Sequence, residues 1–206
     1  ELEKAPVISF RKEFLRWMLS DGAGAFLLEN KPNGKTPLKI EWMEGYSYAH
    51  ELETCMYAGG DKLEDGTMKS WSEYDQEEWT EESIFAIKQD VKLLGENILV
   101  KGVDSLKNAL EKNGVAPKDI TYYLPHVSSY YFRERLFEEM IKQGMEIPWE
   151  NWFMNLSKVG NVGAGSIYIM LEELVASGKL KKGDTILLSV PESARFSYSY
   201  AYLTVC

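Results

Sequence analysis

The interpretation of this chain depends on the stretch Asn155-Leu156-Ser157-Lys158-Val159-Gly160-Asn161-Val162-Gly163-Ala164-Gly165-Ser166. It follows a short apolar segment and leads into an amphipathic pattern over 167–180 that predicts a helix. Glycines permit a tight turn and let another chain or a ligand come close. The amide of Asn161, at the mouth of a helix, is therefore well placed to donate hydrogen bonds to a ligand oxygen. The alternative is a glycine-rich helix start that only packs closely on a strand.

Around this stretch, the hydrophobic pattern predicts strands that alternate with helices. The expected strands are 25–28, 38–49, 120–124, 184–190 and 198–205. The other expected helices are 130–143 and a long one that begins at Thr80, with an apolar stripe over 84–112. This order favours one layered α/β domain over 1–206, with a mixed sheet of about five strands and the long helix packed on it. Residues 50–80 form an irregular excursion within that domain.

Composition excludes several classes of protein. The chain has 206 residues, of which 45% are hydrophobic, and no apolar run is long enough to span a membrane. Its net charge of −9 argues against general affinity for nucleic acid. Cys55 and Cys206 are too few for a disulfide framework, and the charged start is no signal peptide, so the cytoplasm is the expected location. Because it lacks an initiator Met, we expect a processed chain or an excised piece.

Only two histidines are available for chemistry. His50 lies in the irregular excursion without obvious partners and is expected at the surface. His126 follows a predicted strand and precedes a helix, and ligands of open α/β sheets bind beyond the carboxyl ends of strands. Asn161 has a similar position, so the two side chains can meet at one sheet edge; the alternative is a histidine that only satisfies a turn. The pattern of histidines and cysteines predicts no metal site, and no nucleotide fingerprint or serine-hydrolase elbow occurs.

Four blocks carry a resemblance to a known family: Ser20-Asp21-Gly22-Ala23-Gly24-Ala25, Leu124-Pro125-His126, Gly160-Asn161 and the closing strand pair. In this order and spacing they resemble the C-terminal half of the β-ketoacyl-acyl-carrier-protein synthase III group, which belongs to the thiolase-fold condensing enzymes. The resemblance covers most of residues 14–206. A degradative thiolase is less similar, because its closing Cys-Gly-Gly motif does not occur here.

The resemblance implies a fold of two similar halves and an acyltransferase activity. The reaction would be a decarboxylative Claisen condensation of acyl-CoA or acyl-ACP with malonyl-ACP, in fatty acid or polyketide biosynthesis, by a homodimer without cofactor. His126 and Asn161 match the family residues that bind the malonyl thioester carbonyl, where two fixed donors stabilise the enolate oxygen. Neither Cys55 nor Cys206 fits the nucleophile, so the chain is expected to start beyond it and to be inactive alone. The alternative is a non-catalytic module that docks a carrier protein or a partner subunit.

The chain also departs from the family pattern. The family's His-Gln-Ala-Asn is replaced by His126-Val127-Ser128-Ser129, and its glycine-rich loop near the end by 191–196, where only Phe196 matches. These departures suggest a branch outside housekeeping fatty-acid synthesis. Phe196, Gly160 and Gly163 are assigned to the substrate pocket.

A basic spot on the predicted helix 130–143 offers a site for the acyl carrier protein. Arg133 and Arg135 lie just after His126, and carrier proteins are acidic, so this spot would steer them although the chain is net negative. The alternative is that the arginines pair with their helix neighbours Glu134, Glu138 and Glu139.

Overall fold

A mixed four-stranded sheet forms the centre of the molecule in the computed structural model, which describes residues 15, 17–32, 34 and 37–206. The strand order is β1-β8-β7-β6. Strand β8 (Ser197–Val205) is antiparallel to both β1 (Leu38–Ser47) and β7 (Thr185–Glu192), whereas β6 (Tyr122–Pro125) is parallel to β7. The sheet is therefore mixed, as the sequence predicts.

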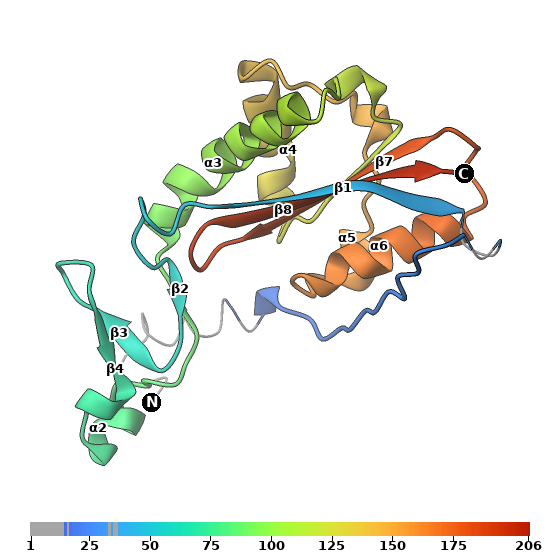
Figure 1. Cartoon of the computed structure of the whole chain (residues 1–206). Helices are drawn as coiled ribbons and strands as arrows, with labels where there is room; N and C mark the ends of the chain where they lie inside the picture. The colour runs from blue at the N-terminus through green and yellow to red at the C-terminus, as the bar shows by residue number, and fades with distance from the viewer. Residues whose placement is uncertain (1–14, 16, 33, 35–36) are drawn as a thin grey trace.

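Helices cover both faces of this sheet, so the fold has three layers (Figure 1). Helices α3 (Val91–Lys112) and α4 (Tyr130–Lys142) lie on one face, and α6 (Gly165–Ala176) lies on the other, preceded by the short α5 (Leu156–Val159). Single 3-10 turns occur at η2 (Pro117–Asp119) and η3 (Trp149–Asn151). The order of helices and strands confirms a layered α/β fold.

The alternation of side chains along each strand divides the core in two. Tyr123 and Leu187 belong to the cluster under α3 and α4, and their neighbours Leu124 and Leu188 belong to the cluster on α6. The face toward α3 is rich in tyrosine, and the hydroxyls reach helix carbonyls: Tyr198 Oη donates to Ile98 O at 2.9 Å. The inner strands β6 and β7 are therefore buried on both faces, whereas the edge strand β1 is largely exposed.

The excursion predicted over 50–80 contains short regular elements and extends to residue 89. Its strands are β2 (Met56–Tyr57), β3 (Gly60–Lys62), β4 (Met68–Ser70) and β5 (Lys88–Gln89), and its helical turns are η1 (Trp71–Glu73) and α2 (Gln76–Glu81). The strands form two antiparallel pairs, β2–β5 and β3–β4, beside the main sheet (Figure 1). Lys62 Nζ lies 2.5 Å from Asp90 Oδ2 at the start of α3, which ties the excursion to the core.

Two expected elements differ from the structure. The long helix begins at Val91 rather than Thr80, because Asp90 caps it by accepting from Leu93 N at 3.0 Å and the residues just before Asp90 pair with β2. Its predicted end at Lys112 is confirmed. The helix after the Asn161 loop spans 165–176 rather than 167–180. Among the described residues, no helix is long and apolar enough to span a membrane.

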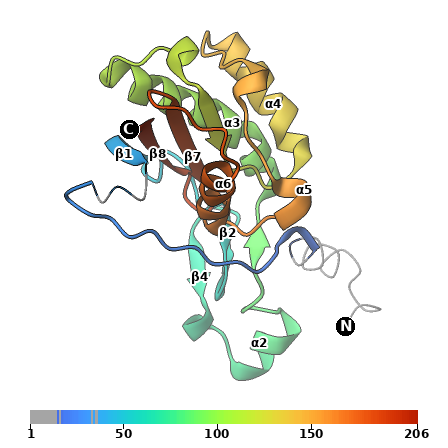
Figure 2. The same cartoon turned by 90° about the vertical axis from the view of Figure 1, so that its right-hand side faces the viewer.

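The expected strand over 25–28 is wrong, and the main sheet has four strands rather than five. Residues 19–29 run past α6 without strand pairing, and Leu27 and Leu28 are 86% and 65% exposed (Figure 2). The apolar sequence alone predicts a strand, but a strand needs a neighbour to take up its backbone hydrogen bonds, and this segment has none within the described parts of the chain. Instead the Phe26 ring packs on the Tyr168 ring of α6, with centroids 4.4 Å apart.

Candidate active site

His126 lies where the sequence predicts, directly after β6 and before α4. Its backbone N–H donates to Ser189 O on the neighbouring strand β7 at 2.8 Å, so the residue is fixed at the carboxyl end of β6, beside β7. The residue is 9% exposed. Burial lowers the pKa of His126 to about 4, because the charged imidazolium would lose its hydration there. At neutral pH the ring is uncharged, with one N–H donor and one lone pair.

Asn161 is buried in the loop between α5 and α6. The residue is 5% exposed, and its Oδ1 accepts from Gly163 N at 3.0 Å. This contact orients the side chain and leaves the two N–H groups of the amide without a partner among the described residues. The amide is therefore held as a donor, as an oxyanion-binding residue requires.

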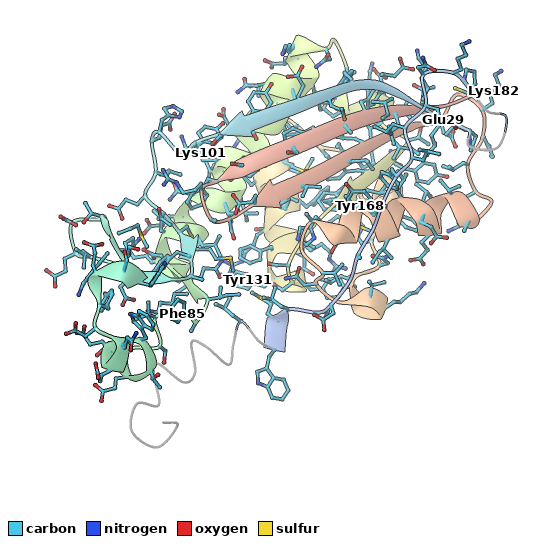
Figure 3. The ribbon with its side chains drawn as sticks, turned by 60° about the horizontal axis from the view of Figure 1, so that its bottom comes forward. Glu29, Phe85, Lys101, Tyr131, Tyr168 and Lys182 are labelled. Carbon is cyan, nitrogen blue, oxygen red and sulfur yellow. The ribbon has the colours of Figure 1, made fainter. Side chains whose placement is uncertain are left out.

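The backbone around Asn161 depends on glycine and on a crossing segment. Gly160 has φ +81°, and a Cβ there would lie 2.3 Å from Ser20 Oγ. Ser20 N donates to Asn161 O at 2.7 Å, and a Cβ on Gly22 would lie 2.7 Å from Val162 Cγ1. The glycines of the first resemblance block thus allow residues 20–24 to lie directly on the Asn161 loop. Figure 3 shows this segment running past Tyr168 toward Glu29.

A narrow cavity joins the two predicted regions. Its lining includes His126 from the end of β6, Gly160 from the Asn161 loop and Ser166 from the first turn of α6, and it has room for roughly one water molecule. The fold therefore brings the His126 turn and the Gly160 loop together, although they are far apart in sequence. Asn161 does not line this cavity, so the cavity is a different space from the one that the His126 and Asn161 side chains are expected to share.

Sequence reasoning missed two buried polar residues of this region. Ser166 is 6% exposed, and its Oγ is buried without a hydrogen-bond partner among the described residues. Asn155 also lines the cavity and donates from Nδ2 to Glu173 Oε2 of α6 at 2.8 Å. Both belong to the stretch that decides the fold, but neither residue type is unusual near a helix start, so only the structure distinguishes them.

The other predicted pocket residues lie apart from the cavity. Phe196 is fully buried in the core cluster under α3 and α4, with φ +53° at the turn between β7 and β8. Its carbonyl accepts from Tyr48 N at 3.1 Å. Gly163 has φ +58° and supports the turn around Asn161. The assignment of Phe196 and Gly163 to a substrate pocket stays a prediction.

The two arginines of α4 are held by aromatic rings. The Arg133 guanidinium lies 4.6 Å from the centre of the Tyr130 ring and 5.1 Å from that of Trp149, and Arg135 lies 3.9 Å from the centre of the Tyr131 ring. Of the helix neighbours considered from the sequence, Glu134 pairs with Arg133 at 3.0 Å. Glu139 pairs instead with Lys142 at 3.2 Å.

The described cysteines and acidic residues suggest no second reactive centre. Cys55 is fully buried in the excursion, where its thiol donates to Asp90 O at 3.4 Å, and burial raises the pKa of Cys55 to about 11. A thiol with so high a pKa has little thiolate at neutral pH. Cys206 is exposed at the end of β8. No group of three or more histidine, cysteine or acidic side chains within the described chain is arranged to hold a metal ion.

The sequence around these residues is similar to that of known proteins. Residues 110–191, which include His126 and Asn161, match the family model "3-Oxoacyl-[acyl-carrier-protein (ACP)] synthase III C terminal". The β-ketoacyl-[acyl-carrier-protein] synthase III of Aquifex aeolicus is 33% identical over 103 residues, covering 48% of this chain and 32% of that protein. The enzyme of the same name from Coxiella burnetii is 27% identical over 175 residues, covering 83% of this chain and 46% of that protein.

Comparison with solved structures agrees with the sequence comparison. The crystal structure of 3-oxoacyl-[acyl-carrier-protein] synthase III from Aquifex aeolicus matches with a TM-score of 0.56 at 22% identity, over 82% of this chain and 46% of that one. The thiolase-like fold class is therefore confirmed, with four strands in the main sheet. The chain spans about a third to a half of the length of these relatives. In sequence and in fold, this chain is therefore similar to the C-terminal half of β-ketoacyl-acyl-carrier-protein synthases III.

Proposed function

We propose that this chain supplies the malonyl-binding half of a condensing active site. In the complete protein, an acyl group from acyl-CoA or acyl-ACP is held as a thioester on a cysteine outside this chain. Malonyl-ACP then loses CO2, and the enolate carbon attacks the acyl carbonyl and expels the cysteine thiolate. The product is a β-ketoacyl thioester, and no cofactor takes part.

One observation carries this proposal: the fold brings the His126 turn and the Gly160–Asn161 loop to one place. His126 and Gly160 line the same cavity, and the amide of Asn161 is oriented by its bond to Gly163 N. A neutral imidazole and a carboxamide are suited to donate N–H groups to an oxygen that becomes negative as decarboxylation proceeds. A module that only docks a partner has no need of a buried, uncharged histidine and of a buried amide held as a donor, so these two features favour the enzyme.

The names of the relatives also support the choice of substrates and partners. The matched proteins are β-ketoacyl-[acyl-carrier-protein] synthases III, which supports an acyl carrier protein as the partner. The proposal includes a homodimer in the cytoplasm and assigns no role to nucleic acid. Because Cys55 is buried and has a raised pKa, the isolated chain is expected to form no acyl-enzyme through that thiol and to be inactive in condensation.

The test is to truncate each donor in the complete protein. His126→Ala and Asn161→Ala should each slow malonyl decarboxylation by roughly 10²–10³, the usual cost of one oxyanion donor. Acylation of the cysteine should suffer less, because both groups act on the second substrate. The double variant should be little worse than either single one, since residues that act as a unit are not additive.

His50→Ala is the matched control, because it removes the only other histidine of this chain, whose side chain is 74% exposed. This control should leave both half-reactions unchanged. Full decarboxylation activity in His126→Ala or in Asn161→Ala would contradict the proposal.

A further inference from the structure

Ser166 presents a polar group that the proposed reaction has not used. Its Oγ is buried and has no hydrogen-bond partner among the described residues, and the residue lines the same cavity as His126. Buried hydroxyls in native proteins nearly always pair with another protein group or with an ordered water. A buried serine without a protein partner, in the first turn of a twelve-residue helix, therefore points to a ligand in this cavity.

The ring of His126 also lacks a hydrogen-bond partner among the described residues. A neutral imidazole carries its proton on only one of two nitrogens, and the hydrogen bond made by the other nitrogen decides which one. The His126 backbone is fixed on β7, but no described residue hydrogen-bonds to its ring. Donation to a thioester oxygen requires one particular tautomer, so something must bond to the remaining lone pair.

A single water molecule in the cavity can hydrogen-bond both to the Ser166 hydroxyl and to the His126 ring. It has room for roughly one water, and a buried water normally makes two to four hydrogen bonds. The amide N–H of Asn155 that faces Glu173 is already used at 2.8 Å, and most of the other lining side chains are apolar, such as Met154, Leu156 and Met170. Ser166 and His126 are therefore the side chains best suited to hold the water.

We propose that Ser166 is a positioning residue for His126. Its hydroxyl holds one water that donates a hydrogen bond to the ring nitrogen of His126 nearer the cavity, so the opposite nitrogen keeps its proton for the thioester oxygen. No covalent bond forms or breaks in this step. The catalytic consequence rests on the proposed function, whereas the effect on the tautomer does not.

The tautomer can be read directly by NMR of the 206-residue chain labelled with 15N-histidine. Only two rings contribute, and exposed His50 serves as an internal reference. At pH 7 the wild-type His126 should show one tautomer, with two well-separated ring nitrogen shifts. Ser166→Ala should give a mixture, in which the two shifts move toward each other, and His50 should not change. Ser166→Thr keeps the hydroxyl and should restore the single tautomer completely. Ser166→Cys keeps only a weaker thiol donor and should restore it in part.

Ser105→Ala is the matched control for loss of a buried serine hydroxyl. Ser105 is fully buried on α3 and bonds to Tyr200 Oη at 2.8 Å, on the other face of the sheet. This variant should leave the His126 shifts unchanged. A single, unchanged tautomer in Ser166→Ala would overturn the inference.

The complete protein gives the second readout. Ser166→Ala should slow malonyl decarboxylation about tenfold, the loss expected for one hydrogen bond of ordinary strength, with acylation of the cysteine unchanged. Slower decarboxylation with an unchanged His126 tautomer would mean that Ser166 contacts the substrate directly, and would also overturn the inference. If His126→Ala and Asn161→Ala keep full activity while Ser166→Ala still alters the tautomer, the proposed function fails and the positioning role stands.

Discussion

His126 shows how one residue takes its chemistry from its surroundings. The same side chain at position 50 lies in solvent near Glu51, with 3.3 Å between His50 Nε2 and Glu51 Oε1. At position 126, burial alone lowers the pKa to about 4. A histidine held neutral in this way remains an N–H donor of constant charge throughout the physiological pH range. That constancy suits a group that must meet developing negative charge without first changing its own protonation.

The low pKa of His126 predicts an acid-sensitive contribution to stability. The unfolded chain binds the proton near the ordinary pKa of 6.5 and the folded chain only near 4, so acidification through this window favours the unfolded state. Between pH 7 and pH 4.5, His126 should therefore reduce the free energy of unfolding by about 2–3 kcal/mol. Urea unfolding of wild type and His126→Gln at both pH values measures the effect as the difference between their pH dependences.

His50→Gln is the control, because it removes the other histidine of the chain, whose side chain is 74% exposed. Equal pH dependence of wild type and His126→Gln would show that His126 titrates normally in the folded chain.

At the scale of the element, strands and helices are predictable where the local sequence pattern and the packing against neighbouring elements favour the same structure. Strands β7 and β8 have both of their neighbours in the sheet, and α3 ends at Lys112, where the apolar stripe ends. The expected strand over 25–28 is wrong because an apolar pattern does not show whether a neighbouring strand is available, and these residues are exposed and pair with no strand among the described residues. The start of α3 was misplaced because Asp90, rather than Thr80, provides the cap.

The candidate site was predictable to a similar degree. His126 lies beyond the end of β6 as predicted, whereas Asn161 lies between α5 and α6 rather than after a strand, and the structure brings His126 and Gly160 to one cavity. Ser166 could not be identified in this way, because an unpaired buried hydroxyl is a property of the folded environment and leaves no pattern in the sequence.

Helix α4 carries the predicted carrier-binding surface. Stacking on Tyr130, Trp149 and Tyr131 holds the two arginines in place, and Arg133 also pairs with the exposed carboxylate of Glu134. Arg133→Glu/Arg135→Glu in the complete protein should therefore weaken binding of the acyl carrier protein by roughly tenfold at low salt, and by less at high salt, since salt screens exposed charges. Titration of the carrier protein at two ionic strengths by calorimetry measures this.

A matched double reversal, Lys181→Glu/Lys182→Glu, changes the net charge equally in the turn before β7. It should have a smaller effect, because Lys182 lies far from α4 (Figure 3). Unchanged affinity of the Arg133/Arg135 variant at low salt would exclude α4 as the docking surface.

At the scale of the whole molecule, the segment that crosses α6 exposes apolar surface. Phe26, Leu27 and Leu28 are all exposed, and their backbone takes no part in a sheet. Extended apolar segments with unpaired backbone groups are typical sites of association between chains. The exposed strand β1 forms one edge of the main sheet and adds a second unpaired row.

The isolated 206-residue chain is therefore expected to self-associate, and residues 26–28 should be responsible. Leu27→Lys/Leu28→Lys should shift the chain toward the monomer by adding like charges to the surface where copies meet, without disturbing the core, because both side chains face solvent. Sedimentation velocity over a hundredfold range of concentration measures the distribution of monomer and larger species.

Val91→Lys is the control and should leave association unchanged, because it adds a charge at an apolar residue at the start of α3 that is about as exposed as Leu28. A wild-type chain that stays monomeric at the highest concentration would contradict the expectation. Association that persists in Leu27→Lys/Leu28→Lys would instead place the contact elsewhere, with the β1 edge as the next surface to test.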